Sequence, residues 1–288
     1  MKILVTGATG FIGNYVIKEL VKRNRFEIIA TSYDPLNKVK AFEWFKDVKY
    51  INQDLNESKE NYFSFFENPD KLIHLSWQDL PNYKKLFHIE RNLFSNYFFL
   101  KNLIISGLKD LSLIGTCLEY GMQEGCLSED NITNPITAYG LAKDTLRKFI
   151  EELNKTFEFK FKWIRLFYIY GEGQNPKSLL PQLDLALDNN EPIFNMSKGD
   201  QLRDYLPIEK VAKYIVEISL QNKFNGIINC CSGEPISIKK FVENHLKKRN
   251  RNIKLNFGYY PYPDYEPMAF WGDNTKLKKI LTMNNQDN

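Results

Sequence analysis

The sequence is poor in cysteine and histidine and has no large charge of either sign. Its 288 residues include four cysteines and three histidines, and no Cys-x-x-Cys pair occurs. A structural zinc site needs several such ligands at short spacing, so we expect no metal centre. The formal net charge is only +4 and is spread along the chain. This argues against a nucleic-acid partner.

Long apolar runs are also missing. No stretch approaches the roughly 20 apolar residues that a membrane-spanning helix needs, and no secretory signal precedes the first predicted strand. We therefore expect no membrane partner and a reduced, cytoplasmic protein. The composition is that of an ordinary globular protein, 43% hydrophobic and 26% charged, with 21 Phe and 16 Tyr available for a core.

Short apolar stretches alternate with helical patterns along most of the chain. We expect strands at residues 2–7, 26–32, 48–54, 71–76, 110–116, 161–171 and 226–232. We expect helices at about 13–23, 86–107, 137–154 and 207–221. This alternation predicts an α/β protein of the Rossmann type, with a doubly wound parallel sheet and helices on both faces.

The composition changes after residue 171, where Pro, Asn and Gly become common and the predicted elements become shorter. We assign residues 1–171 and 206–232 to a dinucleotide-binding domain. Residues 172–205 and 233–288 are expected to form a smaller, mixed lobe that binds the substrate. No internal repeat or low-complexity tract divides the chain further.

Three glycines, Gly7, Gly10 and Gly13, lie between the first predicted strand and the first predicted helix. Glycine permits the tight turn and lets backbone N–H groups approach a pyrophosphate at the positive end of the helix. Because the triplet stands inside a βαβ unit, it predicts a dinucleotide site more strongly than a structural turn.

The glycine spacing is GxxGxxG, and other motifs accompany it. They are Asp54 with Leu55, HLSW at 74–77, YGLAK at 139–143, RLFYIYG at 165–171, RDYLPIEKVA at 203–212 and DNTKL at 273–277. With them the chain resembles, over nearly its whole length, the extended short-chain dehydrogenase/reductase superfamily, in its NAD(P)-dependent nucleotide-sugar epimerase, dehydratase and reductase branch. The resemblance implies cofactor contacts by the glycines and by Thr9, Phe11, Ile12, Asp54, Leu55, Leu75, Ser76, Trp77 and Lys143.

The end of the second strand bears on the choice of cofactor. An acidic residue there bonds the ribose hydroxyls of NAD, whereas a small or basic residue admits the 2′-phosphate of NADP. We place Ser32 at this position, since it ends the second predicted strand, and Asp34 follows two residues later. We therefore favour NADP(H), with NAD(H) as the alternative if Asp34 takes the position.

Two Tyr-x-x-x-Lys pairs occur, Tyr97 with Lys101 and Tyr139 with Lys143. Four residues on a helix place two side chains on one face, one turn apart. A lysine beside a tyrosine favours the phenolate, so we expect the pKa of the catalytic tyrosine to fall toward neutrality. Spacing alone does not choose between the pairs.

Position in the predicted fold distinguishes the two Tyr-x-x-x-Lys pairs. Tyr139 begins its helix just after Pro135, near a sheet edge where a cleft can form, whereas Tyr97 lies mid-helix among apolar residues. Thr116 ends a strand shortly before Tyr139. The resemblance implies that Thr116 bonds the substrate oxygen. We therefore assign catalysis to Thr116, Tyr139 and Lys143, and packing to Tyr97.

The residues that follow Thr116 narrow the choice among possible reactions. The family's 4,6-dehydratases carry an acid and a base directly after this residue, but here those positions hold Cys117 and Leu118, and Glu119 comes one place later. We prefer NADPH-dependent reduction of a nucleotide-linked 4-keto-6-deoxy sugar. An NAD-dependent 4-epimerase is the alternative, and a 4,6-dehydratase or a non-catalytic NADP-binding protein stands behind both.

Substrate contacts and assembly follow from the resemblance only. It implies that Arg203 meets the diphosphate of a nucleotide sugar, whose base stays open; a structural pair with Asp204 is the alternative. The other implied substrate contacts are Thr116, Tyr168, Gln174, Ser178 and Leu179. The helices near 86–107 and 137–154 match those that form a four-helix interface in the superfamily, so a homodimer is expected.

Overall fold

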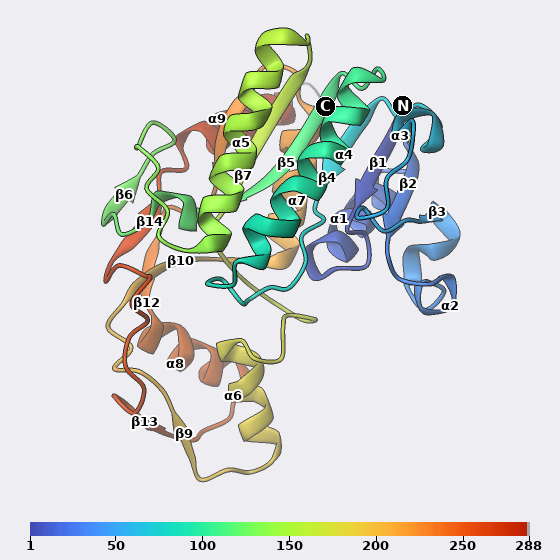
Figure 1. Cartoon of the computed structure of the whole chain (residues 1–288). Coiled ribbons are helices and arrows are strands. Elements are labelled where there is room, and N and C mark those ends of the chain that lie inside the picture. Colours follow the sequence, from blue (N-terminus) through green and yellow to red (C-terminus); the bar gives the residue numbers. More distant parts are fainter. Residues whose placement is uncertain (287–288) are drawn as a thin grey trace.

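The computed structural model describes residues 1–286 and is built around one seven-stranded sheet (Figure 1). All neighbouring strands in it run parallel, in the order β11-β7-β5-β4-β1-β2-β3. They are β1 (Lys2–Thr6), β2 (Glu27–Ser32), β3 (Lys49–Asn52), β4 (Lys71–His74), β5 (Asp110–Thr116), β7 (Lys160–Leu166) and β11 (Gly226–Cys230). Each corresponds to an expected strand, so the predicted Rossmann-type sheet is confirmed.

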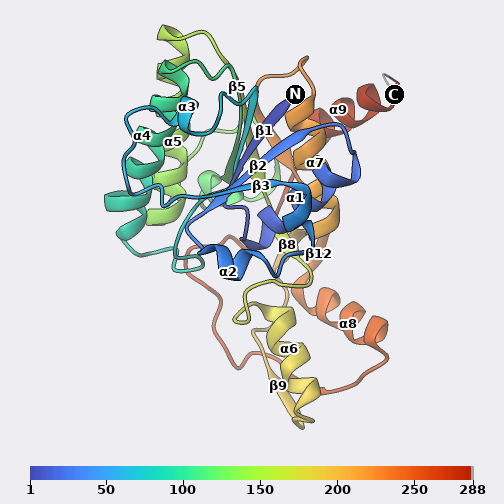
Figure 2. The same cartoon turned by 90° about the vertical axis from the view of Figure 1, so that its right-hand side faces the viewer.

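Helices cover both faces of this sheet (Figure 2). One face carries α3 (Tyr62–Phe65), α4 (Phe94–Ile105) and α5 (Ala138–Thr156), and the other carries α1 (Phe11–Lys22), α7 (Ile208–Leu220) and α9 (Thr275–Gln286). Shorter elements are α2 (Leu36–Val39), η1 (Glu43–Asp47), the π-helical η2 (His88–Leu93) and the 3-10 turn η3 (Cys117–Tyr120). Among the described residues, no helix combines the length and apolarity that a membrane crossing requires.

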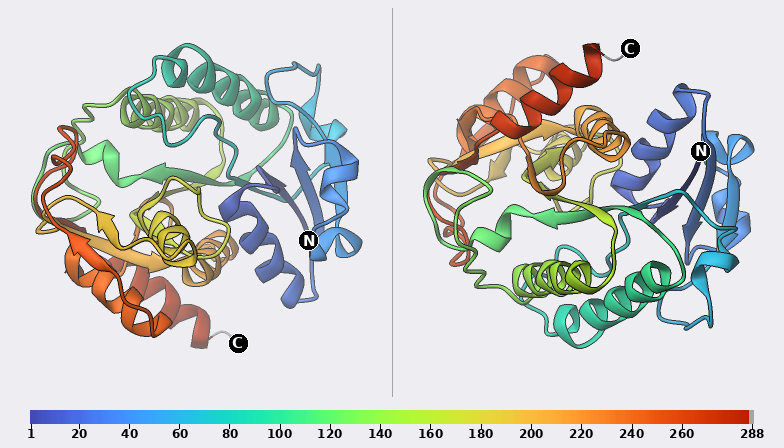
Figure 3. Two further views of the ribbon diagram at one scale, coloured as in Figure 1. Left: turned by 90° about the horizontal axis from the view of Figure 1, so that it is seen from below. Right: turned by 90° about the horizontal axis from the view of Figure 1, so that it is seen from above.

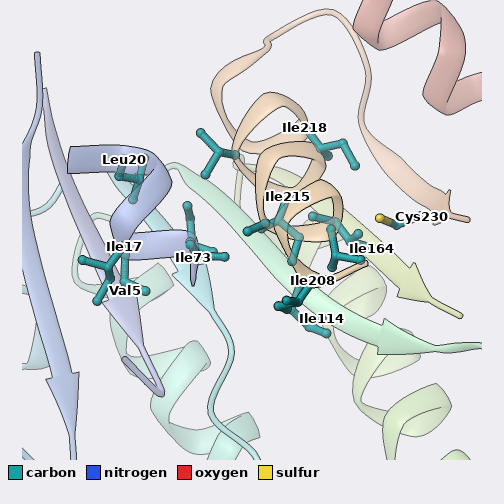
Figure 4. Packing of buried hydrophobic residues seen from close by; sticks show 14 of the residues in the cluster. Val5, Ile17, Leu20, Ile73, Ile114, Ile164, Ile208, Ile215, Ile218 and Cys230 are labelled. Carbon is teal, nitrogen blue, oxygen red and sulfur yellow. The ribbon is translucent and has the colours of Figure 1, made fainter. Parts of the chain in front are cut away.

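Two apolar cores fill the space between the sheet and its helices. Figure 4 shows the core under α1 and α7, where Val5 of β1 and Ile17 of α1 are fully buried. Along β1 the side chains alternate, so Ile3 and Val5 enter this core and Leu4 enters the core under α4 and α5. Because such strands are buried on both faces, they are almost wholly apolar.

The strand order reverses at β1. The chain leaves β3 at one edge and returns as β4 on the other side of β1. In open α/β sheets, the ligand crevice lies beyond the carboxyl ends of the strands at such a point. The smaller lobe lies at that end of the sheet (Figure 1), and Figure 3 shows the helix layers from both ends of the molecule.

The smaller lobe is made from short elements far apart in the sequence. Helices α6 (Leu179–Asp188) and α8 (Ile238–Arg249) share one apolar cluster, and β9 (Ile193–Asn195) pairs with β13 (Lys254–Asn256). A three-stranded sheet, β12-β10-β8, and a two-stranded one, β14-β6, accompany them. Their strands are β6 (Gly125–Leu127), β8 (Tyr168–Tyr170), β10 (Leu202–Pro207), β12 (Pro235–Ser237) and β14 (Phe270–Gly272).

Two expected elements differ in the structure. The single strand expected at 161–171 is two strands, because β8 leaves the main sheet after Phe167 and pairs with β10 instead. The helix expected at 86–107 begins as the π-helical η2 and continues as α4. In addition, Leu277 and Ile280 of α9 join the core under α7, although α9 lies within the range 233–288 that was assigned to the substrate lobe.

Candidate active site

The glycine loop closes tightly on the segment after β4. Gly7 has a φ of +67°, and a side chain there would meet the backbone of Leu75 and Ser76 at 2.9 Å. A Cβ at Gly13 would lie 2.1 Å from the Gly7 carbonyl oxygen. α1 starts directly after Gly10, with no side-chain cap and no acidic residue in the first turn. The positive end of α1 is therefore open to a pyrophosphate.

A carboxylate lies beside this loop at the end of β2. Asp34 accepts a hydrogen bond from the Thr9 hydroxyl at 2.6 Å. The Ser32 hydroxyl is engaged elsewhere, since it shares a hydrogen bond with the Tyr50 hydroxyl at 2.8 Å and accepts one from the Asp34 N–H at 3.2 Å. The group that faces the glycine loop is thus acidic, as suits ribose hydroxyls better than a 2′-phosphate.

β5 and α5 bring Thr116, Tyr139 and Lys143 together. Thr116 is the last residue of β5, and α5 starts after Thr137, whose side chain accepts a hydrogen bond from the Gly140 N–H at 3.0 Å. Tyr139 and Lys143 lie one turn apart on α5. The Thr116 side chain interacts with the Tyr139 hydroxyl and favours its phenolate form. None of the three catalytic candidates is more than 7% exposed.

Lys143 also contacts the segment expected to border the cofactor. Its ammonium donates to the Ile114 carbonyl oxygen at 2.9 Å and lies 3.9 Å from the centre of the Trp77 ring. The Trp77 indole N–H in turn donates to His88 at 3.1 Å. The glycine loop, residues 75–77 and Lys143 therefore form one continuous wall.

Burial changes the acidity of both catalytic candidates on α5. It raises the pKa of Tyr139 above its ordinary value, and it lowers the pKa of Lys143 to about 7 against the attraction of the Glu119 carboxylate. The expected fall in the pKa of the tyrosine is wrong for this structure, because desolvation of the phenolate dominates. Tyr139 is therefore a neutral hydroxyl at ordinary pH.

Two loops that the sequence did not single out cover Tyr139. The Tyr83 ring packs 5.4 Å from the Tyr139 ring, and the Tyr83 carbonyl accepts a hydrogen bond from the Tyr139 N–H at 2.9 Å. The second loop packs the Tyr265 ring on Tyr83 at 6.0 Å and pairs Asp264 with Lys84 at 2.6 Å. A cavity of about 350 Å³ lies at their junction. The aromatic and acidic run YYPYPDYEP at 259–267 was the available signal, but it indicated only a loop.

Arg203 and Tyr168 lie behind the Thr116 turn. The Arg203 guanidinium is fully buried, donates to Glu266 at 3.0 Å and lies 5.6 Å from the Tyr168 ring. Asp204 is not its partner, because that carboxylate accepts the Ser232 N–H at 2.7 Å. The structure thus pairs Arg203 with Glu266 inside the protein, and its contact with a substrate diphosphate stays a prediction.

The loop after β8 reaches from the smaller lobe to the cofactor loop. A Cβ at Gly173 would lie 3.8 Å from the Phe11 ring, and the Gln174 side chain donates to the Ile169 carbonyl oxygen at 2.9 Å. Ser178 stands at the start of α6, and Leu179 packs against the apolar cluster of the smaller lobe. The loop therefore joins the two parts at Gly173, while Leu179 belongs to the smaller lobe.

Asp54 and Leu55 follow β3, whose end pairs with the end of β2. The Asp54 carboxylate accepts the Asn56 N–H at 3.0 Å, and Leu55 packs against the core under α4. Both stand at the carboxyl edge of the sheet, as an adenine contact requires, but on the far side of β2 from the catalytic residues.

The glycine loop, the open end of α1, Asp34 and the buried lysine together suit a dinucleotide. The model of the NAD dependent epimerase/dehydratase family matches residues 3–231, most of the chain. The chain belongs to this family. It is therefore an NAD(P)-dependent enzyme, and the resemblance inferred from the motifs is confirmed.

Relatives within the epimerase/dehydratase family match along almost the whole chain. The chain is 32% identical over 277 residues to dTDP-6-deoxy-L-talose 4-dehydrogenase (NAD(+)) from Aggregatibacter actinomycetemcomitans, covering 94% of this chain and 99% of that protein. It is 27% identical over 272 residues to dTDP-4-dehydro-6-deoxyglucose reductase from Escherichia coli, covering 88% and 84%.

A solved structure shares the same fold. UDP-glucuronic acid 4-epimerase from Bacillus cereus, in complex with UDP-glucuronic acid and NAD, superposes with a TM-score of 0.83. The alignment covers 98% of this chain and 93% of that one at 24% sequence identity. At this identity the likeness establishes the architecture and leaves the reaction to the residues of the site.

Proposed function

We propose that the enzyme transfers a hydride between NAD(H) and C4 of a nucleotide-linked 6-deoxyhexose, interconverting the alcohol and the 4-keto sugar. The observation that carries this proposal is the buried trio of Thr116, Tyr139 and Lys143 beside the glycine loop. The nearby carboxylates, Glu119 and Glu266, are each paired with an arginine. Elimination of water needs a free acid and base, so these pairings favour redox chemistry without dehydration.

The chain's own residues handle the proton. A sugar oxygen placed against the neighbouring hydroxyls of Thr116 and Tyr139 can hydrogen-bond to both. Tyr139 gives its proton to this oxygen when the carbonyl is reduced, and its phenolate form takes the proton when the alcohol is oxidised. The Lys143 ammonium stabilises the phenolate that remains, in surroundings from which water is excluded. The nicotinamide, when bound, supplies or accepts the hydride.

For the cofactor we favour NAD over the NADP that Ser32 suggested. The Ser32 hydroxyl is already bonded within the protein, and Asp34 presents its carboxylate beside Thr9. The relative from Aggregatibacter that is named for NAD(+) supports the same choice. Asp34→Ser should raise the KM for NAD about tenfold and lower that for NADP. Steady-state assays with both cofactors measure the two KM values. An unchanged ratio of these values would contradict the choice of NAD.

Dehydrogenase and 4-ketoreductase describe the two directions of this one reaction. The relatives named above carry one name of each kind, and both are named for dTDP sugars. We therefore propose a dTDP-linked 6-deoxyhexose as the substrate. The expected 4-epimerase is the competing function, since it would use the same trio to return the hydride to the opposite face of the sugar.

The test is a direct assay with dTDP-6-deoxy-L-talose and either NAD or NADP. Net formation of reduced nicotinamide, followed by its absorbance, together with a 4-keto product identified by mass, supports the proposal. Conversion to an epimer with no net reduced cofactor supports the epimerase. If dTDP-, GDP- and UDP-linked 6-deoxyhexoses all fail to react, the oxidoreductase proposal is refuted.

We also propose a homodimer formed through α4 and α5. The outer face of α4 leaves Phe94, Phe98 and Ile105 between 44% and 61% exposed. Such residues at helical spacing are suited to burial against a second copy of the chain. A division into a cofactor domain and a substrate lobe, and a cytoplasmic location, remain predictions. We now attach α9 to the cofactor domain because of its packing on α7.

A further inference from the structure

Glu119 is a fully buried carboxylate at the end of the turn that presents Thr116. It accepts hydrogen bonds from three donors. The Thr116 N–H lies at 2.8 Å, the Trp163 indole N–H at 3.0 and 3.1 Å from its two oxygens, and the Arg165 Nε at 2.6 Å. A buried charge is normally retained only where such donors replace the lost water. The proposed reaction assigns this residue no step.

The surrounding chain is shaped around this carboxylate. A Cβ at Gly115 would lie 2.5 Å from a Glu119 oxygen and 2.2 Å from the Trp163 indole nitrogen, so only glycine leaves room. Thr116 and Glu119 form a reciprocal capping box at the start of η3, in which the Thr116 hydroxyl accepts the Leu118 N–H at 3.3 Å. Both the backbone and the hydroxyl of Thr116 are thus held by this turn.

The donors that hold Glu119 come from a rigid neighbour. Trp163 and Arg165 stand on β7, and Arg165 pairs in register with Gly115 on β5. Arg165 is also fully buried, and its guanidinium lies 4.5 Å from the Tyr120 ring. A fixed strand therefore locates the carboxylate, and the carboxylate locates the Thr116 backbone.

We propose that Glu119 is a positioning residue for the reaction. Its carboxylate, anchored by Trp163 and Arg165, fixes the Thr116 backbone so that the Thr116 hydroxyl meets Tyr139 and the substrate oxygen. This rests on the proposed function only in naming that oxygen. It also explains why a carboxylate stands in this run without serving as an acid or base for dehydration.

The test separates positioning from stability. Removing Glu119 alone strands the Arg165 charge, so both variants are made in an Arg165→Met background. Glu119→Gln retains an acceptor for the Thr116 N–H, whereas Glu119→Met has nearly the same shape and no such acceptor. With dTDP-6-deoxy-L-talose and NAD, we expect the Met variant to have a kcat about 100-fold below that of the Gln variant, with similar KM values.

A second measurement does not depend on turnover. Hydrogen exchange of the Thr116 amide should be slow in the wild type and the Gln variant and at least about tenfold faster in the Met variant, because its acceptor is gone. Exchange elsewhere in β5 should agree in the two variants, so that the change is local to Thr116. Lack of wild-type turnover would count against the proposed function, and the exchange result would still decide whether Glu119 fixes Thr116.

Three outcomes would overturn the inference. Equal kcat in the two variants would mean that the acceptor does not position Thr116 for catalysis. Equal Thr116 exchange would mean that the backbone is fixed without Glu119. Faster exchange throughout β5 in the Met variant would also reject it, since Glu119 would then act only on stability.

Discussion

Two Tyr-x-x-x-Lys pairs lie on adjacent helices of the same face, and the structure surrounds them differently. On α4, Tyr97 packs edge-on against Phe149 at 5.1 Å, and the Lys101 ammonium lies 5.8 Å from the Tyr97 ring. On α5, Tyr139 and Lys143 are buried at the carboxyl end of β5, and each has a polar partner there. Equal spacing gives equal proximity, but only burial at the ligand edge of the sheet supplies a reacting group.

Removal of the phenolic oxygens should have the largest effect, and it should differ most between Tyr139 and Tyr97. Tyr139→Phe should lower kcat about a thousandfold, because the proton donor is lost while the ring and its packing remain. Tyr97→Phe should change kcat by no more than about twofold, since that hydroxyl contacts no reacting group. Steady-state rates, with NAD binding followed by nicotinamide fluorescence as the control, check both. A comparable loss in the two variants would contradict the assignment.

The two lysines should differ in both activity and stability. Lys143→Met should reduce kcat at least about 100-fold, and Lys101→Met should have little effect. Burial lowers the pKa of Lys143 to about 7, below its value in the unfolded chain, so the wild type bears the cost of a buried charge below pH 7. As the pH rises from 7 toward 10.5, the unfolded chain holds the proton that the folded chain has released, and the wild type gains stability.

The expected result is a Lys143→Met variant that melts a few degrees above the wild type at pH 6, with the gap closing toward pH 10. Melting curves across this range provide the measurement, with Lys101→Met as the matched control. A Lys143→Met variant that is less stable than the wild type at pH 6 would show that the buried ammonium is well compensated.

The aromatic side chains that pack on the two tyrosines, Tyr83 and Phe149, should have smaller effects on catalysis. Tyr83→Ala should admit water to Tyr139 and bring the raised pKa of its phenol down toward the ordinary value, with a loss in kcat/KM of about tenfold. Phe149→Ala at Tyr97 should leave kcat/KM within about threefold. Alkaline titration of phenolate absorbance, corrected with Tyr139→Phe, reports the change. An unshifted Tyr139 titration would show that Tyr83 does not shield it.

The smallest expected effect on catalysis concerns the helix of the non-catalytic pair. Phe98→Asp places a charge on the exposed apolar face of α4 and should convert the proposed dimer to monomers in light scattering. Activity should stay within about twofold, because Phe98 is 61% exposed and its ring packs on Phe94 and Tyr97. Phe98→Tyr is the control that retains the apolar ring. A wild-type chain that is already monomeric would disprove the dimer.

The main sheet, and the proximity of Thr116, Tyr139 and Lys143, could be predicted because their signals are local. Buried strands read as apolar runs, and the glycine loop stands between a strand and a helix. The choice of Tyr139 over Tyr97 also needed only chain order, since a cleft forms where parallel strands end.

What the sequence could not provide depends on contacts between distant segments. Whether Asp34 or Ser32 faces the glycine loop depends on a side chain turning back to Thr9. The rise in the pKa of Tyr139 depends on cover from Tyr83, 56 positions earlier in the chain. The Glu266 partner of Arg203 lies 63 residues away. None of these contacts has a periodicity or spacing by which it could be recognised.

The proposed reaction is net hydride transfer between C4 of the sugar and NAD(H), with Tyr139 transferring the proton. The most direct measurement uses dTDP-6-deoxy-L-talose deuterated at C4, incubated with NAD, with mass analysis of cofactor and sugar. We predict deuterium in the reduced nicotinamide, a 4-keto sugar without it, and neither product with Tyr139→Phe. Deuterium that remains on C4 of an epimerised sugar, with no reduced nicotinamide released, would contradict the account.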